Sequence, residues 1–245
     1  MKNKKALFIP LVLAAALFFT TCGLDTTYYI NMTGTAVHEP VYTSSDFASN
    51  YFEFTSATKP SEFDSDFKFL GTAVYYRIYA DISTMMSRQS AISAVNTATD
   101  YTAAATKMIG YGYQQLNTSD GNVQPLITAE GVKVRIRLTN YGAENDSSNE
   151  YRAQITYLNK IPRRSIGQTK TFDFGRHGNN KYTPQENYDL PAAGDEDFEN
   201  GTVKDNKYYV DLYAVALGRD TTFTLYYSQV LHLGSIPIDA TAENN

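Results

Sequence analysis

The chain has 245 residues and a formal net charge of −5. Its sequence pI of about 5.2 argues against nucleic acid as a partner, because no excess of basic residues is available to contact phosphates. A single cysteine excludes a fold held by disulfides within the chain. The composition includes 20 tyrosines, 13 phenylalanines and no tryptophan. Tyrosine and phenylalanine are enriched in strands, so these counts favour a β-rich protein.

The first 21 residues have the pattern of a secretory signal. Residues 1–5 are positively charged, and residues 6–19 are apolar apart from Pro10. This apolar run is shorter than the roughly 20 residues that a helix needs to cross a bilayer. We therefore expect residues 1–21 to be a cleaved signal peptide rather than a permanent anchor.

Cys22 ends this segment in the sequence "ALFFTTCG". The pattern resembles a bacterial lipobox, with Phe19 and Thr21 in place of the usual leucine and small residue. Spirochaetal lipoproteins relax the motif in this way, and "CGLDTTYYI", "FKFLGTAVYYRIY" and "MIGYGYQQL" are similar to uncharacterised treponemal lipoproteins. The resemblance implies that Cys22 is acylated and becomes the N-terminus of an exported protein. That protein would be lipid-anchored to the bacterial membrane, at the outer membrane or its periplasmic face. The alternative is an unmodified Cys22 in an uncleaved tail or as a free thiol.

The rest of the chain is expected to form one domain. We predict a lipidated N-terminus and tether over residues 22–47, in which "TYYIN" at residues 27–31 is an alternative first strand. A single β-sandwich domain is predicted over 48–238 and a disordered tail over 239–245. The stretch 176–206 is polar and reads as a long surface loop, either functional or mobile.

Alternating apolar and polar residues predict the strands. In "VKVRIRL", residues 132–138, an apolar face alternates with a basic face of Lys133, Arg135 and Arg137. Weaker alternation predicts further strands beginning at Phe67, Tyr151, Thr169, Lys207 and Thr222. Turn-forming residues predict hairpins at 219–221 and at 140–151.

The stretch 82–116 lacks strand alternation. Apolar residues recur there at helical spacing, and a second helix is expected from Tyr101 to Ile109, before Gly110. The predicted fold is therefore a mainly β, antiparallel β-sandwich of the immunoglobulin-like or fibronectin-like kind, with a helical insertion around 82–116. A barrel is the alternative.

Two motifs suggest chemistry. Arg176-His177-Gly178 resembles the phosphate-binding element of histidine phosphatases, which implies a nucleophilic His177 and a phosphate-binding Arg176, although the rest of that pattern is missing. An acidic run supplies hard oxygen ligands of the kind that calcium prefers, at Asp195, Glu196, Asp197, Glu199 and Asn200. For both motifs the simpler interpretation is a solvated loop. Zinc is disfavoured because the three histidines, His38, His177 and His232, are scattered along the chain.

Two surface features suggest binding. The basic stripe of Lys133, Arg135 and Arg137, extended by Arg163 and Arg164, suits an anionic glycan or lipid headgroup, although a solvated sheet face is the commoner meaning. Adjacent tyrosines at 28, 75, 208 and 226 point to opposite faces of a strand. One ring of each pair is then an exposed platform, unless the helices of 82–116 cover it.

These observations favour a non-catalytic, lipid-anchored lipoprotein of the cell envelope. Its lipid on Cys22 would bind the membrane, and its domain would bind a protein or glycan through loops and exposed tyrosines. We predict no catalytic residue, no metal site and no cofactor. The alternative function is an envelope hydrolase acting on phosphate esters or glycans, with His177 at its site.

Overall fold

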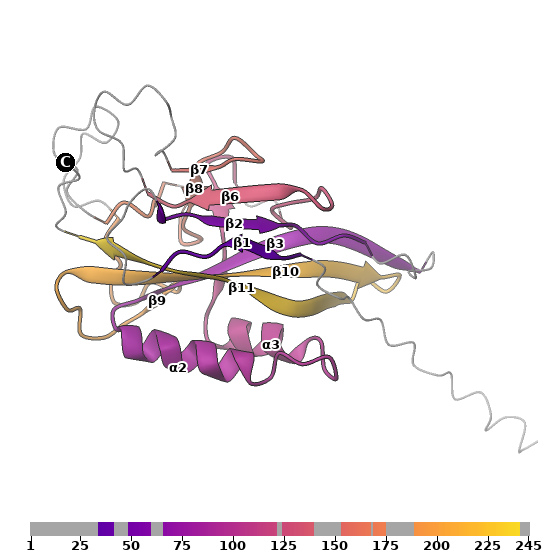
Figure 1. Ribbon diagram of the computed structural model, residues 1–245, viewed down its shortest axis with the longest axis horizontal. Coiled ribbons are helices and arrows are strands. Elements are labelled where there is room, and N and C mark those ends of the chain that lie inside the picture. Colours follow the sequence, from indigo (N-terminus) through magenta and orange to yellow (C-terminus); the bar gives the residue numbers. More distant parts are fainter. Residues whose placement is uncertain are drawn as a thin grey trace, which may run out of the picture.

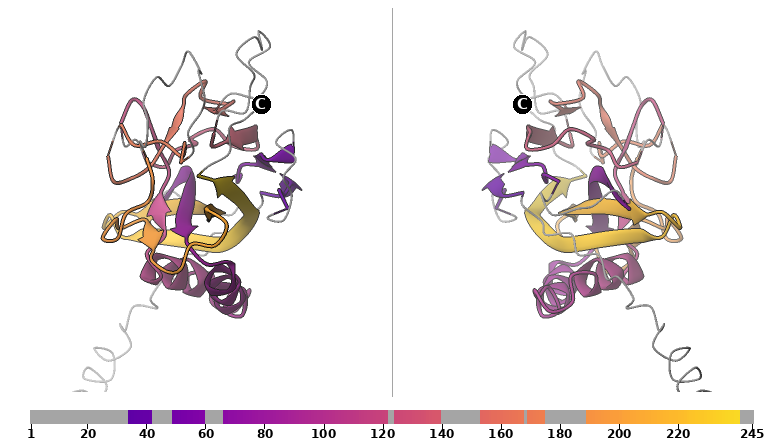
Figure 2. Two further views of the ribbon diagram at one scale, coloured as in Figure 1. Left: turned by 90° about the vertical axis from the view of Figure 1, so that its left-hand side faces the viewer. Right: turned by 90° about the vertical axis from the view of Figure 1, so that its right-hand side faces the viewer.

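The computed structural model describes residues 34–41, 49–59, 66–121, 124–139, 153–167, 169–174 and 189–240. They form three layers: two stacked β-sheets, and two helices on the outer face of one of them (Figures 1 and 2). This arrangement confirms a mainly β fold of sandwich type with antiparallel sheets. Its immunoglobulin-like or fibronectin-like character stays a prediction.

The central sheet carries the longest strands. Its order is β11 (Leu225–Asp239), β10 (Lys207–Asp220), β3 (Phe67–Tyr79) and β4 (Gln114–Gln115), all antiparallel to their neighbours. The short strand β9 (Phe198–Glu199) pairs with β3 in parallel. The predicted strands from Phe67, Lys207 and Thr222 are thus confirmed, and the last two form the predicted hairpin. Its turn is displaced to 221–224, because β10 continues through Asp220.

The second sheet is shorter. Its order is β1 (Ala36–His38), β2 (Phe52–Thr55), β6 (Lys133–Arg137) and β7 (Gln154–Ile155). A two-stranded ribbon of β5 (Asn117–Thr118) and β8 (Pro162–Arg163) accompanies it. Strand β1 lies inside the range predicted as tether, and β11 ends inside the range predicted as tail. The folded part therefore extends beyond 48–238 at both ends.

Strand β3 shows why the central sheet is apolar on both faces. Val74, Tyr76 and Ile78 pack against the second sheet, whereas Tyr75 and Tyr79 pack toward the helices. Because successive side chains alternate between faces, a strand covered on both sides reads as a nearly continuous apolar run.

The helical insertion around 82–116 is confirmed by α2 (Ile82–Ser93) and α3 (Ala103–Gly110). Asp81 caps α2, since its carboxylate accepts a hydrogen bond from the backbone N–H of Thr84 at 2.9 Å. Met85, Ile92 and Met108 are fully buried beneath the helices. The helices thereby cover one face of the central sheet.

Two strand predictions are wrong in extent. The segment from Thr169 forms no strand over its described residues 169–174, although Phe172 and Phe174 are buried. Its backbone bonds outside any strand pairing instead: Thr171 N–H donates to the Asp189 carboxylate at 2.8 Å, and the Lys170 carbonyl accepts from Arg164 N–H at 2.9 Å. The strand predicted from Tyr151 is reduced to β7, followed by a turn.

Candidate functional site

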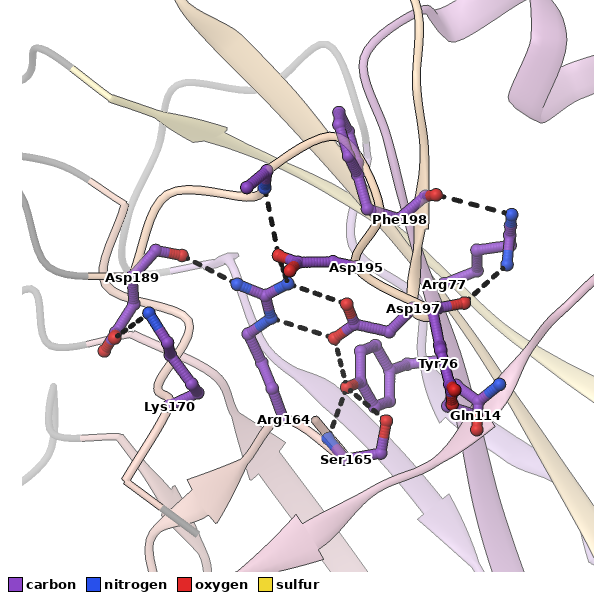
Figure 3. Close-up of polar contacts among 12 residues, drawn as sticks. Tyr76, Arg77, Gln114, Arg164, Ser165, Lys170, Asp189, Asp195, Asp197 and Phe198 are labelled. Carbon is purple, nitrogen blue, oxygen red and sulfur yellow. Dashed lines mark hydrogen bonds and ion pairs between the residues drawn. The ribbon is translucent and has the colours of Figure 1, made fainter. Parts of the chain in front are cut away.

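The acidic run is built into the fold through Arg164, which is fully buried (Figure 3). Its guanidinium binds both carboxylate oxygens of Asp197, at 2.8 and 2.7 Å, and one oxygen of Asp195 at 2.7 Å. The Tyr76 hydroxyl donates to Asp197 at 2.5 Å and accepts from the backbone N–H of Ser165 at 2.7 Å. Burial alone would lower the pKa of Arg164, but the two carboxylates outweigh it and raise that pKa.

The other end of the run is held by Arg77. Its guanidinium binds the Glu199 carboxylate at 2.5 Å and the Gly112 carbonyl at 2.6 Å, and Arg88 approaches Glu199 at 3.3 Å. Gly112 has φ +82°, and a side chain there would overlap the Arg77 guanidinium. The solvated-loop interpretation is therefore wrong for Asp195, Asp197 and Glu199, whereas Glu196 and Asn200 are exposed. The extension of the basic stripe to Arg164 is also wrong. These ion pairs fix 195–199 against the central sheet.

The basic stripe on β6 is also partly neutralised. Lys133 and Arg135 both pair with Glu53 on the neighbouring strand, at 2.6 and 2.8 Å. Burial of Glu53 would raise its pKa, but hydrogen bonds and charge from the two cations lower it. Arg137 is buried, with its guanidinium 5.5 Å from the centre of the Tyr51 ring. The stripe is thus a paired sheet surface rather than an open anion site.

The described tyrosine pairs are buried at 75 and half-buried at 208 and 226. Tyr75 and Tyr76 are both buried, one toward the helices and one toward the second sheet. The helices therefore cover the outer face, as the alternative interpretation held. Of the tyrosines that the structure describes, Tyr157 alone is exposed, at 41%.

A cavity of about 510 Å³ lies between α2 and the central sheet. Its walls come from α2 and the segment after it, and from strands β10 and β11. They are formed by Gln89, Ser90, Ile92, Ser93, Ala94, Asn96, Tyr213, Val230 and His232.

Beneath this cavity lies the fully buried carboxylate of Asp211, on β10. One oxygen accepts from Gln89 at 2.9 Å, from Ser235 at 2.7 Å and from His232 Nε2 at 2.7 Å. The other accepts from the hydroxyl of Tyr113. Four donors, two of them on β11, thus compensate one buried charge.

His232 is the titratable member of this network that lines the cavity. Its side chain is 38% exposed, and its ring centre lies 4.8 Å from that of Tyr213. Burial would lower the pKa of His232, but the hydrogen bond and charge of Asp211, with a contribution from Glu39, raise it. Because Nε2 donates to Asp211, Nδ1 is the acceptor of the neutral ring.

These groups suit a neutral polar ligand. The exposed face of the His232 ring, the Gln89 amide oxygen and serine hydroxyls offer stacking and hydrogen bonds of both polarities. Ser235 donates to Asp211 rather than to the imidazole, so the three side chains are not arranged as a Ser–His–Asp triad. The geometry supports binding better than nucleophilic catalysis.

Sequence reasoning missed this network. His232 was considered only as a zinc ligand, and Gln89 and Asp211 were not singled out. The available signal was an aspartate within the apolar strand "YYVDLYAV", since a carboxylate buried there requires partners. Cys22, Arg176, His177 and the tyrosine pair at 28 lie outside the described residues, so the predictions made for them stay predictions.

No protein-family model, curated protein or solved structure matches the chain. Over the ranges that the structure describes, no helix is long and apolar enough to span a membrane. Within the same ranges, no three His, Cys, Asp or Glu side chains gather where they could hold a metal ion.

Proposed function

We propose that the protein is a non-catalytic, lipid-anchored lipoprotein of the bacterial cell envelope, whose domain binds a short neutral glycan in the cavity between α2 and the central sheet. The sequence of residues 1–22 supports the anchor. The observation that carries the binding role is the cavity itself, whose wall combines Tyr213, His232 and Gln89 above a compensated carboxylate.

A glycan is favoured over a protein ligand at this site. Sugars present apolar faces for aromatic rings and hydroxyls for amides and imidazoles, whereas a protein partner requires a broad surface. Of the described tyrosines, all but Tyr157 are buried or half-buried, so few of the exposed platforms that a larger surface would use are present in that part of the chain. The bound ring would lie against the exposed face of His232, with its hydroxyls at Gln89 and at the serine side chains of the wall.

The binding role is tested by titrating the purified protein with neutral mono- and disaccharides, including N-acetylated ones, and measuring affinity by calorimetry. Gln89→Leu and His232→Ala are expected to weaken binding at least about tenfold, which corresponds to about 1.4 kcal/mol. His38→Ala is the matched control, because His38 stacks on Tyr51 in the other sheet. Absence of binding to the whole panel, or equal affinity in all variants, would refute the role.

The anchor is tested by metabolic labelling with palmitate and by protease treatment of intact cells, comparing the wild type with Cys22→Ala. We expect label on the wild type alone, together with loss of membrane attachment in the variant. Degradation by external protease would place the domain at the cell surface, and protection would place it in the periplasm. Unchanged attachment of Cys22→Ala would overturn the lipobox interpretation.

A further inference from the structure

The turn between β10 and β11 presents two large apolar side chains to solvent. Phe223 is 71% exposed and Leu225 is 50% exposed. Figure 1 shows the ends of β3 and β10 reaching beyond the helices and the second sheet along the long axis of the molecule. The two side chains therefore lie at the end of a long, paired ribbon.

This turn is held in an unfavourable conformation. Phe223 has φ +67°, a region that a bulky aromatic residue rarely adopts. Asp220 fixes it: one carboxylate oxygen accepts from the backbone N–H groups of Thr222 and Thr224, both at 2.9 Å. The second oxygen accepts from the Tyr226 hydroxyl at 3.0 Å. A strained, exposed phenylalanine held by four neighbouring residues suggests selection for what the tip contacts.

Several polar groups of the turn are bonded internally. In addition to the bonds of Asp220, Phe223 N–H donates to the Asp220 carbonyl at 3.1 Å and the Thr224 carbonyl accepts from Asp220 N–H at 3.2 Å. The Thr222 hydroxyl also donates to the Asp220 carboxylate, at 2.8 Å. Groups that are already hydrogen-bonded within the turn stay paired when the turn leaves water. Polar groups that enter lipid must be paired in this way.

Cations lie immediately behind the apolar tip. The Arg219 guanidinium is 5.0 Å from the centre of the Phe223 ring, and Lys68 on β3 lies opposite Arg219 in the strand register. Both side chains can place their charge at the depth of lipid headgroups. Asp66 is exposed nearby, and the carboxylate of Asp220 is engaged by the turn. Two apolar side chains on a convex tip present far less than the roughly 800 Å² per partner of a stable protein interface.

We propose that the β10–β11 turn is a membrane contact, in which Phe223 and Leu225 enter the interfacial region of a bilayer while Lys68 and Arg219 contact anionic headgroups. A second contact of this kind would orient a domain attached through its N-terminus. This orienting role rests on the proposed lipid anchor. The contact of the turn with the bilayer does not, because it does not involve Cys22.

The absence of tryptophan from the chain provides a direct test. Phe223→Trp introduces a single indole at the tip, and the full-length protein is reconstituted on phosphatidylcholine vesicles with and without phosphatidylglycerol. We expect a blue-shifted emission and quenching by brominated lipids, both stronger on anionic vesicles and both lost when Leu225→Asp is added. Tyr157→Trp, at an exposed turn after β7, is the control and should show neither effect.

Four results separate the possible outcomes. An unshifted, unquenched Phe223→Trp overturns the proposal, as does a blue shift that depends on protein concentration without vesicles, which would indicate a second copy as the partner. Phe223→Gly should unfold no more easily than the wild type, because it relieves the positive φ. A weaker contact of this variant with vesicles would therefore come from the missing ring and not from unfolding. If Cys22→Ala leaves attachment unchanged while quenching persists, the anchor proposal fails and the tip contact stands.

Discussion

Two aspartates lie on opposite sides of the central sheet, and both are completely buried. Asp197, on the side of the second sheet, is bound by the guanidinium of Arg164, which cannot lose its proton in the physiological range. Asp211, on the helical side, is bound by neutral donors and by His232, which can titrate. The same chemical group thus serves a fixed structural link in one region and an adjustable site in the other.

Accessibility separates the two regions further. Arg164 has no exposed surface, so a ligand has no route to its charge. His232 is 38% exposed and lines the cavity. Both regions compensate a buried charge. Of the two, only the region around Asp211 is also accessible to a ligand.

Breaking the ion pairs of Arg164 with Asp195 and Asp197 should have the largest effect on stability. Arg164→Met removes the cation and leaves Asp197 buried beside Tyr76, which we expect to lower the free energy of unfolding by about 3–5 kcal/mol. Urea unfolding followed by circular dichroism measures it. Arg163→Met, at the half-buried neighbouring position, is the control and should cost less than about 1 kcal/mol. Equal losses in the two variants would show that the ion pairs of Arg164 have no special importance.

Asp211→Asn should have the next largest effect. The Asp211 carboxylate accepts four hydrogen bonds through two oxygens, whereas the asparagine amide has a single oxygen. Its NH₂ group would face a hydrogen-bond donor at the place where the second carboxylate oxygen now accepts. We expect a loss of about 2 kcal/mol in the free energy of unfolding, because buried donors lose their acceptor. The pKa of His232, followed by NMR, should fall in the same variant. A raised pKa that survives the substitution would contradict the assignment of its cause.

The pH dependence of stability should distinguish the region of Asp211 and His232 from that of Asp197 and Arg164. The pKa of His232 is raised in the folded protein, so its stabilising contribution is complete below the unfolded value of about 6.5 and is lost as the pH rises through the folded value. Because the side chain is partly exposed, the change should be below about 1 kcal/mol. Thermal unfolding of the wild type against His232→Gln measures it. Parallel curves for the two proteins would exclude this contribution.

Filling the cavity should have the smallest effect on stability. Ser93 is exposed at the end of α2 and lines the cavity. Ser93→Leu should change the free energy of unfolding by no more than about 0.5 kcal/mol, since no buried bond is broken. Glycan affinity should nevertheless fall, as calorimetry would show. Undiminished affinity would place the ligand elsewhere.

The sequence predicted the long strands and the helices because both follow local rules. In "VKVRIRL" the alternation marks β6, and a weaker alternation from Phe67 marks β3. The segment from Thr169 shows where those rules fail. Phe172 and Phe174 satisfy the strand pattern, yet the side chain of Asp189, distant in sequence, takes the backbone bond that a neighbouring strand would have made.

Neither polar region could be located from local composition. The run 195–199 looks solvated because it is rich in acids, while the arginines that neutralise it stand at positions 77, 88 and 164. Likewise, Gln89, Asp211 and His232 belong to a helix and two strands far apart in the chain. An isolated aspartate in an apolar strand signals that partners are needed, but the pattern does not say which residues they are.

By itself, therefore, the sequence determined a β-rich fold free of internal disulfides, the long strands and the position of the helical insertion, since composition and periodicity act over neighbouring residues. It also carries the signal pattern that ends at Cys22. Only the tertiary structure decided that the acidic run is paired, that the tyrosines are covered, and that Asp211 and His232 meet beside a cavity. These outcomes depend on which side chains, distant in sequence, meet in the fold to pair a buried charge or to cover a ring. Patterns among neighbouring residues do not contain that information.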